Sequence, residues 1–323
     1  MTTRVLVPQP IAPAGLEVLH EAGLETRELD TTDAAELRQA IVGCAGVLVR
    51  TAPLPADVLS AAPGLEVVSR HGVGLDAIDT GYCRDHGIRV TFAPESNTVT
   101  VAEHTIGLMT AITKNLRTVD VATRAGDFGA RSRSYGIELD GKTLGVVGLG
   151  RIGRLVAQKA RLGFGMRVLG YDAYLPEDAG PEGVHRCTLE ELLASSDVVT
   201  VHVPFTPGSR HVIDAAGLRA MKRDAYLVNC SRGGTVDEAA MIDALRDGHL
   251  AAAGLDVFET EPLPAGHPLT ALDNVLLSPH MAAHSTEALD RMAAHAAEGI
   301  IDVLGGREPR WPADRPLAGH RPG

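Results

Sequence analysis

The chain carries the sequence Gly148-Leu149-Gly150-Arg151-Ile152-Gly153, which follows an apolar run at 142–147 and precedes a helix-like segment at 154–162. In such a pattern the first glycine permits a tight turn from strand to helix, the second lets backbone approach a pyrophosphate, and the third lets the helix pack on the strand. The unpaired N–H groups at the start of the helix then point toward the anion. The stretch therefore predicts a dinucleotide-binding unit, with Gly148, Gly150, Arg151, Ile152 and Gly153 at the cofactor.

A second apolar run, at 166–171, ends at Asp172, about 20 residues beyond the last glycine of the pattern. An acid at this position accepts hydrogen bonds from the hydroxyls of the adenosine ribose. The next residue is Ala173, and no arginine lies close by in the sequence to neutralise a 2′-phosphate. These residues predict NAD rather than NADP. In the alternative interpretation Asp172 only caps a loop.

Composition and charge restrict the class of protein. A length of 323 residues suits two domains, and 45% hydrophobic against 22% charged residues indicates a globular chain. The net charge of −11 argues against a nucleic-acid surface and against an anionic membrane surface. No signal peptide or membrane span is recognisable, and the four scattered cysteines form no CxxC pair. We therefore expect a reduced, cytoplasmic protein.

Short apolar runs alternate with helical segments in both halves of the chain. Strands joined by helical crossovers form parallel sheets. The expected fold class is therefore α/β with two doubly wound parallel-sheet domains, a Rossmann cofactor domain and a flavodoxin-like substrate domain, with a cleft between them. Apart from the two runs already described, the predicted strands lie at 4–7, 46–50, 65–69, 88–92, 197–202, 225–229, 253–257 and 275–278.

Two long helices connect the predicted domains. The segment 98–116 has apolar residues at helical spacing and leads into the cofactor domain, whereas a helix at 286–304 returns to the first domain. The substrate domain is therefore predicted to be discontinuous, at 1–98 and 287–323, with the NAD-binding domain at 99–286. The final residues, 311–323, are expected to form a loose arm.

Three polar residues follow predicted strands of the cofactor domain, at the edge where ligands bind in open α/β sheets. The guanidinium of Arg232 can grip a carboxylate with two parallel hydrogen bonds. The imidazole of His280 can exchange a proton near neutral pH, and the carboxylate of Glu261 can fix its tautomer. Together they suit hydride transfer at the carbon beside a carboxylate, although each taken singly is more often an ordinary surface residue.

The chain resembles the D-isomer-specific 2-hydroxyacid dehydrogenases, the family that includes the short phosphoglycerate, glycerate and hydroxypyruvate enzymes. The similarity runs from about Val47 to about Thr286 and does not include a regulatory extension. It rests on blocks of sequence that occur in the order typical of that family, at 70–79, 96–104, 148–153, 201–207, 229–234, 254–262 and 278–280.

The resemblance implies a role for each of the three residues. Arg232 binds the substrate carboxylate, Glu261 is the partner of His280, and His280 donates or accepts the proton. An intact Glu261 disfavours the formate dehydrogenases of the same superfamily, which carry Gln there. Homodimers joined through the cofactor domain are usual in the family. The resemblance further implies a cofactor cleft lined by His202, Val203, Pro204, Thr206, Cys230 and Asp256, the last at the nicotinamide carboxamide.

The first domain supplies the predicted substrate-binding residues. By resemblance, the backbone of Val73 and Gly74 holds the substrate carboxylate. Arg50, Arg70 and His71 are candidates to bind a second anionic group, or else are strand-end polar residues tied to the backbone. The phosphoglycerate enzymes often have a second arginine where this chain has Ala52, which weakens a phosphoglycerate-specific interpretation. The complete set of substrate candidates is Arg50, Arg70, His71, Gly72, Val73, Gly74 and Asn97.

Other function classes stay open at this point. The same scaffold occurs in NADH-sensing corepressors, although a pure sensor has no use for the Arg, Glu and His set. A hydrolase that uses NAD internally would need a catalytic thiol or lysine, and none is evident. His280 and His284 lie four residues apart, but no further ligand completes a zinc site nearby, so no metal is predicted. The predicted partner is a small anionic 2-hydroxy or 2-keto acid.

Overall fold

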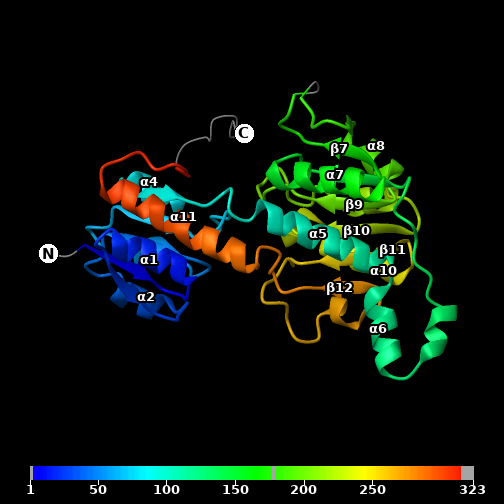
Figure 1. Ribbon diagram of the computed structural model, residues 1–323, viewed down its shortest axis with the longest axis horizontal. Coiled ribbons are helices and arrows are strands. Elements are labelled where there is room, and N and C mark those ends of the chain that lie inside the picture. Colours follow the sequence, from blue (N-terminus) through cyan, green and yellow to red (C-terminus); the bar gives the residue numbers. More distant parts are fainter. Residues whose placement is uncertain (1–2, 177–178, 314–323) are drawn as a thin grey trace. The chain divides into compact units, whose positions relative to one another are not determined.

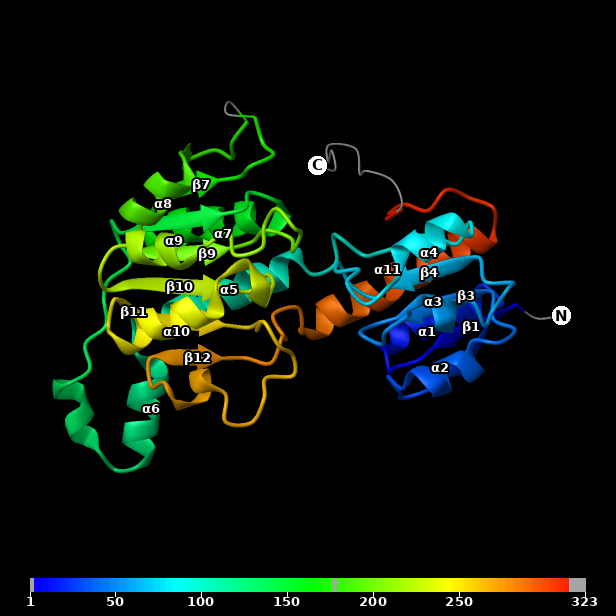
Figure 2. The same cartoon turned by 180° about the vertical axis from the view of Figure 1, so that it is seen from behind.

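The computed structural model describes residues 3–176 and 179–313. The chain divides into two compact units, of which the first comprises Met1–Asn97 and His284–Gly323 and the second Thr98–Ala283. Figure 1 and Figure 2 show both units, each with a central sheet covered by helices. Each unit is described by itself below.

The first unit is built on a five-stranded parallel sheet in the order β2-β1-β3-β4-β5. This order matches the flavodoxin-like arrangement. Three of the strands are predominantly apolar, because a parallel sheet covered on both faces is buried on both sides. The strands are β1 (Arg4–Val7), β2 (Glu25–Glu28), β3 (Gly46–Val49), β4 (Val67–Arg70) and β5 (Arg89–Thr91).

Helices cover both faces of this sheet. The last helix of the chain, α11 (Thr286–Leu304), packs against α1 (Pro13–Glu21) and against β3 and β4. Its residues Ala296, Ala297 and Ile300 form one apolar cluster with β1, and a second cluster fills the opposite face. The helices of that second face are α2 (Ala34–Ala40), α3 (Ala56–Leu59) and α4 (Thr80–Asp85).

The segment after α11 corrects one sequence prediction. Residues 311–323 were expected to form a loose arm, but Trp311 is buried and stacks against His295. The N–H of Phe92 donates to the Trp311 carbonyl, and the N–H of Ala313 donates to the Val90 carbonyl at 2.7 Å. The prediction was wrong for 311–313, because the free edge of β5 offers backbone groups with which this segment pairs. The rest of the predicted arm, 314–323, lies outside the described residues.

The second unit is built on a seven-stranded parallel sheet in the order β12-β11-β10-β9-β6-β7-β8. The strand order reverses at β6, and the carboxyl ends of strands beside such a reversal form the crevice where dinucleotides bind. The predicted fold class, two parallel-sheet α/β domains, is confirmed. The strands are β6 (Thr143–Val147), β7 (Arg167–Tyr171), β8 (Val184–Arg186), β9 (Val198–Val201), β10 (Ala225–Asn229), β11 (Leu250–Leu255) and β12 (Val275–Leu277).

Two layers of helices cover this second sheet. On one face α5 (Thr98–Thr113) packs on β10, β11 and α7 (Arg151–Phe164). On the other face lie α8 (Leu189–Ser195), α9 (Ala215–Ala220) and α10 (Glu238–Arg246). No helix within 3–176 and 179–313 combines the length and the hydropathy that crossing a bilayer requires.

One helix of the second unit has no buried residue. The helix α6 (Leu116–Arg124) and the 3-10 segment η1 (Phe128–Ser132) extend away from the sheet as an arm. Large apolar side chains on and beside this arm are exposed, namely Leu116, Val121, Phe128 and Tyr135. We call 116–135 the arm.

Candidate active site

The glycine turn at 148–153 joins β6 to the start of α7, as the sequence predicts. Gly148 has φ +97°, and a Cβ atom there would lie 2.8 Å from the His202 carbonyl carbon. At Gly153 a Cβ atom would lie 2.0 Å from the Gly148 carbonyl oxygen. Gly150 has open space where a side chain would be, and it precedes α7 without a side-chain cap. The uncapped backbone at this helix start fits a pyrophosphate.

Asp172 follows β7 and binds the backbone of the glycine turn. Its Oδ2 accepts a hydrogen bond from the Leu149 N–H at 2.9 Å. Its Oδ1 accepts from the N–H groups of Tyr174 and Leu175, at 2.9 and 3.2 Å. These bonds orient the carboxylate, and Oδ2, which accepts only one of them, still has a lone pair with which it can accept from a ribose hydroxyl. Asp172 therefore combines a loop-capping contact with the geometry of a ribose acceptor.

One expectation about Asp172 needs correction, because an arginine does approach it in space. The Nη2 of Arg186 donates to the carbonyl oxygens of Asp172 and Leu175 at 3.0 and 3.3 Å. Parallel pairing of β7 with β8 sets Gly170 opposite Arg186, which brings this side chain beside the turn. Its Nε and Nη1 atoms are buried and have no hydrogen-bond partner among the described residues. The expectation that no arginine lies close to Asp172 is therefore wrong in three dimensions.

Two titratable residues of the predicted cofactor cleft, His202 and Cys230, are neutral at neutral pH. His202 follows β9, and its Nε2 lies 2.9 Å from the Thr200 hydroxyl. Desolvation lowers the pKa of His202 to about 3, so its imidazole is uncharged at neutral pH. Burial raises the pKa of the Cys230 thiol to about 12, which keeps it protonated and unreactive. Thr206 belongs to a turn that Ser209 closes, because the Thr206 N–H donates to the Ser209 Oγ.

His280 and Glu261 form a hydrogen-bonded pair. The Nδ1 of His280 lies 2.6 Å from Glu261 Oε2, and Glu261 Oε1 accepts from the Phe258 N–H at 3.1 Å. Since Nδ1 faces a carboxylate, it carries a proton, which leaves Nε2 to exchange one with a ligand. About half of the His280 side-chain surface, 48%, is exposed. The geometry is that of an acid–base histidine held by a carboxylate.

The environment of Glu261 favours its charged form. Desolvation alone would raise the pKa of this carboxyl, but hydrogen bonds from His280 and from the Phe258 N–H outweigh it and lower the pKa below its usual value. The positive charges of His280 and Arg232 add to this lowering. Because the pKa is lowered on folding, the pair stabilises the protein at neutral pH, and that stability is lost as pH falls through the lowered pKa.

Asp256 is fully buried and holds the backbone around His280. Its Oδ1 accepts from Ser278 Oγ at 2.6 Å and from the Met281 N–H at 2.9 Å, and its Oδ2 accepts from the Ala282 N–H at 2.8 Å. The Asp256 carbonyl also accepts from the His280 N–H, at 2.8 Å. These contacts fix His280 in a left-handed conformation, φ +51°. The predicted contact of Asp256 with a nicotinamide carboxamide stays a prediction.

Sequence reasoning missed two residues of this support. His104, on α5, has its Nε2 3.0 Å from Ser278 Oγ, and Ser278 in turn donates to Asp256. His104 stands in the block at 96–104 and Ser278 in the block at 278–280, both of which had been singled out for their resemblance to the family. Their pairing across 174 residues has no local sequence signal.

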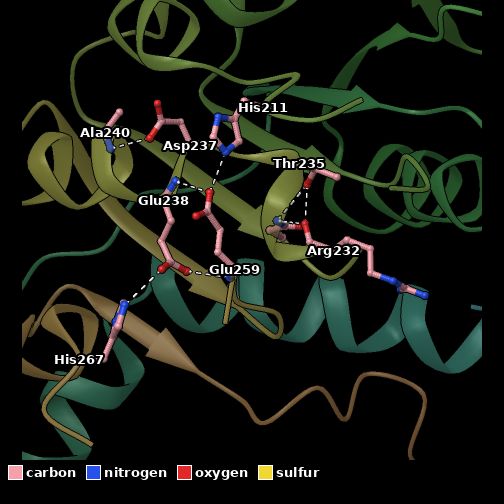
Figure 3. Close-up of polar contacts among 9 residues, drawn as sticks. His211, Arg232, Thr235, Asp237, Glu238, Ala240, Glu259 and His267 are labelled. Carbon is pink, nitrogen blue, oxygen red and sulfur yellow. Dashed lines mark hydrogen bonds and ion pairs between the residues drawn. The ribbon is translucent and has the colours of Figure 1, made fainter. Parts of the chain in front are cut away.

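Arg232 sits in a turn that begins at the end of β10. The Asn229 amide donates to the Arg232 carbonyl at 3.0 Å, as does the Thr235 hydroxyl at 2.6 Å (Figure 3). The next residue, Gly233, has no room for a side chain, because a Cβ atom there would lie 1.9 Å from the Phe258 carbonyl carbon. The arginine turn therefore rests directly on the chain that leads to Glu261.

The substrate candidates of the first unit make contacts within that unit. Arg70 donates through Nε to the Gly74 carbonyl at 2.7 Å and through Nη1 to the His71 carbonyl. Arg50 donates to the Pro10 carbonyl at 2.7 Å. Burial and the charges of the two arginines lower the pKa of His71 to about 4. These bonds to backbone shape the loop that includes Gly72, where φ is +131°, and their role toward a substrate stays a prediction.

Three buried polar atoms of the first unit lack a partner among the described residues. They are His71 Nε2, Asn97 Oδ1 and His295 Nδ1. Unpaired polar groups in a protein interior cost free energy unless a ligand or water completes them. They are therefore compatible with a polar ligand on this unit.

Comparison with known proteins decides the family. A protein-family model, described as the NAD binding domain of D-isomer specific 2-hydroxyacid dehydrogenases, matches residues 106–282. The chain is 44% identical over 265 residues to a glyoxylate reductase of Thermofilum pendens, covering 80% of this chain and 78% of that one. The chain belongs to the D-isomer-specific 2-hydroxyacid dehydrogenase family. This finding confirms the resemblance and the dinucleotide-binding domain predicted from the sequence.

Other members of the family share the whole described architecture. A D-3-phosphoglycerate dehydrogenase of Methanocaldococcus jannaschii is 40% identical over 306 residues, which cover 94% of this chain but 58% of that protein. The chain thus spans somewhat more than half of the length of the phosphoglycerate dehydrogenases it matches. The crystal structure of an NADPH-dependent glyoxylate/hydroxypyruvate reductase from Sinorhizobium meliloti, in complex with NADP and malonate, aligns over both complete chains with a TM-score of 0.87 and 32% identity.

The tight packing of Gly233 against the Phe258 backbone leads to a prediction. A Gly233→Ala variant should lose roughly 1–3 kcal/mol of stability, because the added methyl group collides with backbone that cannot give way. The matched control is Gly163→Ala in α7, where the Cβ position is open and alanine is the better helix former. Calorimetric melting of the two variants checks this. A Gly233→Ala protein with the same melting temperature as the wild type would contradict the described packing.

Proposed function

We propose that this protein is an NAD-dependent dehydrogenase that interconverts a D-2-hydroxy acid and its 2-keto acid. The observation that carries the proposal is the His280–Glu261 pair at 2.6 Å, on the same unit as the glycine turn and as Arg232. The named relatives, a glyoxylate reductase and a D-3-phosphoglycerate dehydrogenase, support it. The substrate is a small anionic acid, because a guanidinium is suited to bind a carboxylate.

The chain's own residues divide the work of the reaction. A bound nicotinamide supplies the hydride to the carbonyl carbon, or accepts it in the reverse direction. In reduction, His280 donates its Nε2 proton to the carbonyl oxygen as that oxygen becomes a hydroxyl. Glu261 stabilises the protonated imidazole and holds its ring. Arg232 grips the substrate carboxylate and stabilises negative charge that develops beside it.

The residues of the first unit would complete recognition of the substrate. We propose that the backbone of Val73 and Gly74 binds the carboxylate, with Asn97 and His71 as further polar contacts. The bonds from Arg70 to this loop support a shaped binding segment. We propose Arg50 and Arg70 as the residues that would bind a second anionic group, because a guanidinium is suited to bind an anion.

We also propose that NAD is preferred to NADP. The Asp172 carboxylate, oriented by three backbone N–H groups, supports this preference, since a negative charge repels a 2′-phosphate. Arg186 lies beside Asp172, but its Nη2 is engaged with the carbonyl oxygens of Asp172 and Leu175.

The arm of the second unit supports a homodimer as the working state. Phe128 and Tyr135 are 71% and 75% exposed, and an apolar surface of this kind on a protruding segment is typical of a protein–protein contact. We propose a second copy of this chain as the partner, because a twofold axis lets each arm bury the same residues against its counterpart.

The cysteines support a reducing compartment. Cys44, Cys83, Cys187 and Cys230 are all free thiols. Reduced thiols are typical of proteins in the cytoplasm. We therefore propose a cytoplasmic location.

The acid–base role of His280 gives a prediction. A His280→Ala variant should lose about 10²–10⁴-fold in kcat with NADH and glyoxylate or hydroxypyruvate, since that is the usual contribution of a positioned proton donor. The control is His185→Ala on β8, an exposed histidine of the same unit, which should keep wild-type turnover. Steady-state kinetics measure both. Wild-type protein that binds NADH but reduces no 2-keto acid would instead favour an NADH-sensing protein.

The cofactor assignment gives another prediction. An Asp172→Asn variant should bind NADH about tenfold more weakly, because a charged hydrogen bond to the ribose is lost, while binding of NADPH changes less. Asp243→Asn, on the exposed surface of α10, serves as the control. Titrations that follow NADH and NADPH fluorescence give the dissociation constants. The assignment is refuted by a wild-type protein that binds NADPH more tightly than NADH.

The proposed dimer is tested on the arm. A Phe128→Asp variant should be a monomer in solution. The exposed ring is replaced by a carboxylate, and burying an unpaired charge in the dimer interface costs free energy. Val42→Asp, in the first unit, is the matched control and should leave the dimer intact. Light scattering coupled to size-exclusion chromatography gives the mass. A monomeric wild-type protein would rule the dimer out.

A further inference from the structure

The loop that carries Glu261 presents a second carboxylate, and that carboxylate also binds a histidine. Glu259 Oε1 lies 2.8 Å from the Nε2 of His211, as Glu261 Oε2 lies 2.6 Å from the Nδ1 of His280. The two glutamates are two residues apart in the chain and bond histidines from different segments. The His280 pair has a role in the proposed reaction, whereas the His211 pair has none so far.

His211 is held in an uncommon conformation between two parts of the site. Its φ is +47°, in the left-handed region that non-glycine residues seldom adopt. Its N–H donates to the Gly234 carbonyl at 2.9 Å, in the turn that carries Arg232. Such a conformation persists where the surroundings determine it, and it is enriched at functional sites. His211 thus joins the arginine turn to Glu259.

Glu259 and Glu238 exchange hydrogen bonds between side chain and backbone. The Glu238 N–H, in the first turn of α10, donates to Glu259 Oε1 at 3.4 Å. In return, the Glu259 N–H donates to Glu238 Oε2 at 3.2 Å (Figure 3). A carboxylate at the start of a helix is favoured by the helix dipole. Two hydrogen bonds, one donated by each residue, therefore hold the loop at Glu259 against the start of α10.

His267 contacts the other oxygen of the Glu238 carboxylate. Its Nε2 lies 3.2 Å from Glu238 Oε1, and the two side chains are only 17% and 12% exposed. The Leu269 N–H donates to the His267 Nδ1, so Nε2 is the nitrogen that carries a proton toward Glu238. We call His211, Glu259, Glu238 and His267 the anchoring cluster (Figure 3).

The anchoring cluster contacts both segments that carry the proposed catalytic groups, the arginine turn at Gly234 and the loop 258–261 at Glu259. Gly233 contacts the Phe258 backbone so closely that no side chain fits between them, and Phe258 donates its N–H to Glu261. Figure 3 shows the Arg232 side chain pointing away from the His211–Glu259 pair, so the cluster acts on the turn and not on the guanidinium. Exposed ion pairs usually contribute little to stability. Glu259, however, also accepts from the Glu238 N–H, and it lies two residues from Glu261.

We propose that Glu259, held by His211 and Glu238, is a positioning residue that keeps the loop 258–261 in place, so that Glu261 reaches His280 beside the Arg232 turn. This inference rests on the proposed function for its catalytic consequence. A displacement of about 1 Å at a catalytic group can cost about 10²-fold in rate, so partial loosening of this loop affects turnover.

The test compares Glu259→Ala, Glu259→Gln and the control Glu190→Ala, an exposed glutamate at the start of α8. With NADH and hydroxypyruvate, Glu259→Ala should lower kcat about tenfold and leave the KM for NADH unchanged. Glu259→Gln keeps an acceptor oxygen for His211 and for the Glu238 N–H and should recover most of the rate. Equal rates for the alanine and glutamine variants would overturn the role of the acceptor.

Hydrogen exchange of the free protein tests the anchoring without any turnover. In Glu259→Ala, amides of the segment 258–261 should exchange faster than in wild type, whereas Glu190→Ala should leave them unchanged. Unchanged exchange in Glu259→Ala overturns the proposal. If wild-type protein reduces no 2-keto acid while the exchange differs as expected, the proposed function fails and the anchoring of the loop stands.

The pH profile separates positioning from a general loss of structure. As a carboxylate, Glu261 holds His280, and hydrogen bonds from His280 and the Phe258 N–H lower the pKa of Glu261. Loosening the loop in Glu259→Ala should let that pKa return toward its usual value, so the acidic limb of kcat/KM for hydroxypyruvate should move to higher pH. A profile that falls in height at an unchanged pH shows a merely structural effect and overturns the catalytic part of the proposal.

Discussion

The hydrogen bond between His280 and Glu261 is the interaction on which the proposed chemistry depends. At 2.6 Å it assigns one imidazole nitrogen to the carboxylate and leaves the other for a substrate. A lone strand-end histidine would have no fixed ring orientation and no partner for its charged form. The carboxylate keeps its charge because hydrogen bonds and nearby positive groups outweigh the cost of its partial burial.

Much of the second unit serves to hold the two ends of this bond. Asp256, buried beneath the chain that carries His280, accepts three hydrogen bonds from 278–282 and fixes the histidine from one side. The anchoring cluster holds Glu259, and Gly233 packs tightly against the Phe258 backbone, so both hold the loop that carries Glu261. Placement of the proposed proton donor and its carboxylate therefore depends on polar contacts within this unit, both buried, as at Asp256, and partly exposed, as at Glu259.

The fold could be predicted where the sequence has continuous apolar runs or regularly spaced apolar residues. The buried strands of both sheets have such runs, and α11 was predicted at the residues where it lies. The edge strands β2 and β8 were missed because their residues are largely polar and exposed, which removes the apolar signal. The pairing of 311–313 with β5 was missed for a related reason, since a sheet edge can bind a segment of almost any sequence through backbone groups alone.

The sequence by itself determined the family, the parallel α/β architecture and the identity of Arg232, Glu261 and His280 as candidates, because glycine turns and strand-end polar residues have short-range patterns. The tertiary structure added the 2.6 Å contact to the His280–Glu261 pairing that the resemblance implied. It alone decided that Arg186 lies beside Asp172 and that His211, Glu238 and His267 gather around Glu259. Those contacts join residues that are far apart in the chain, and their distances depend on strand order and register, for which no local pattern exists.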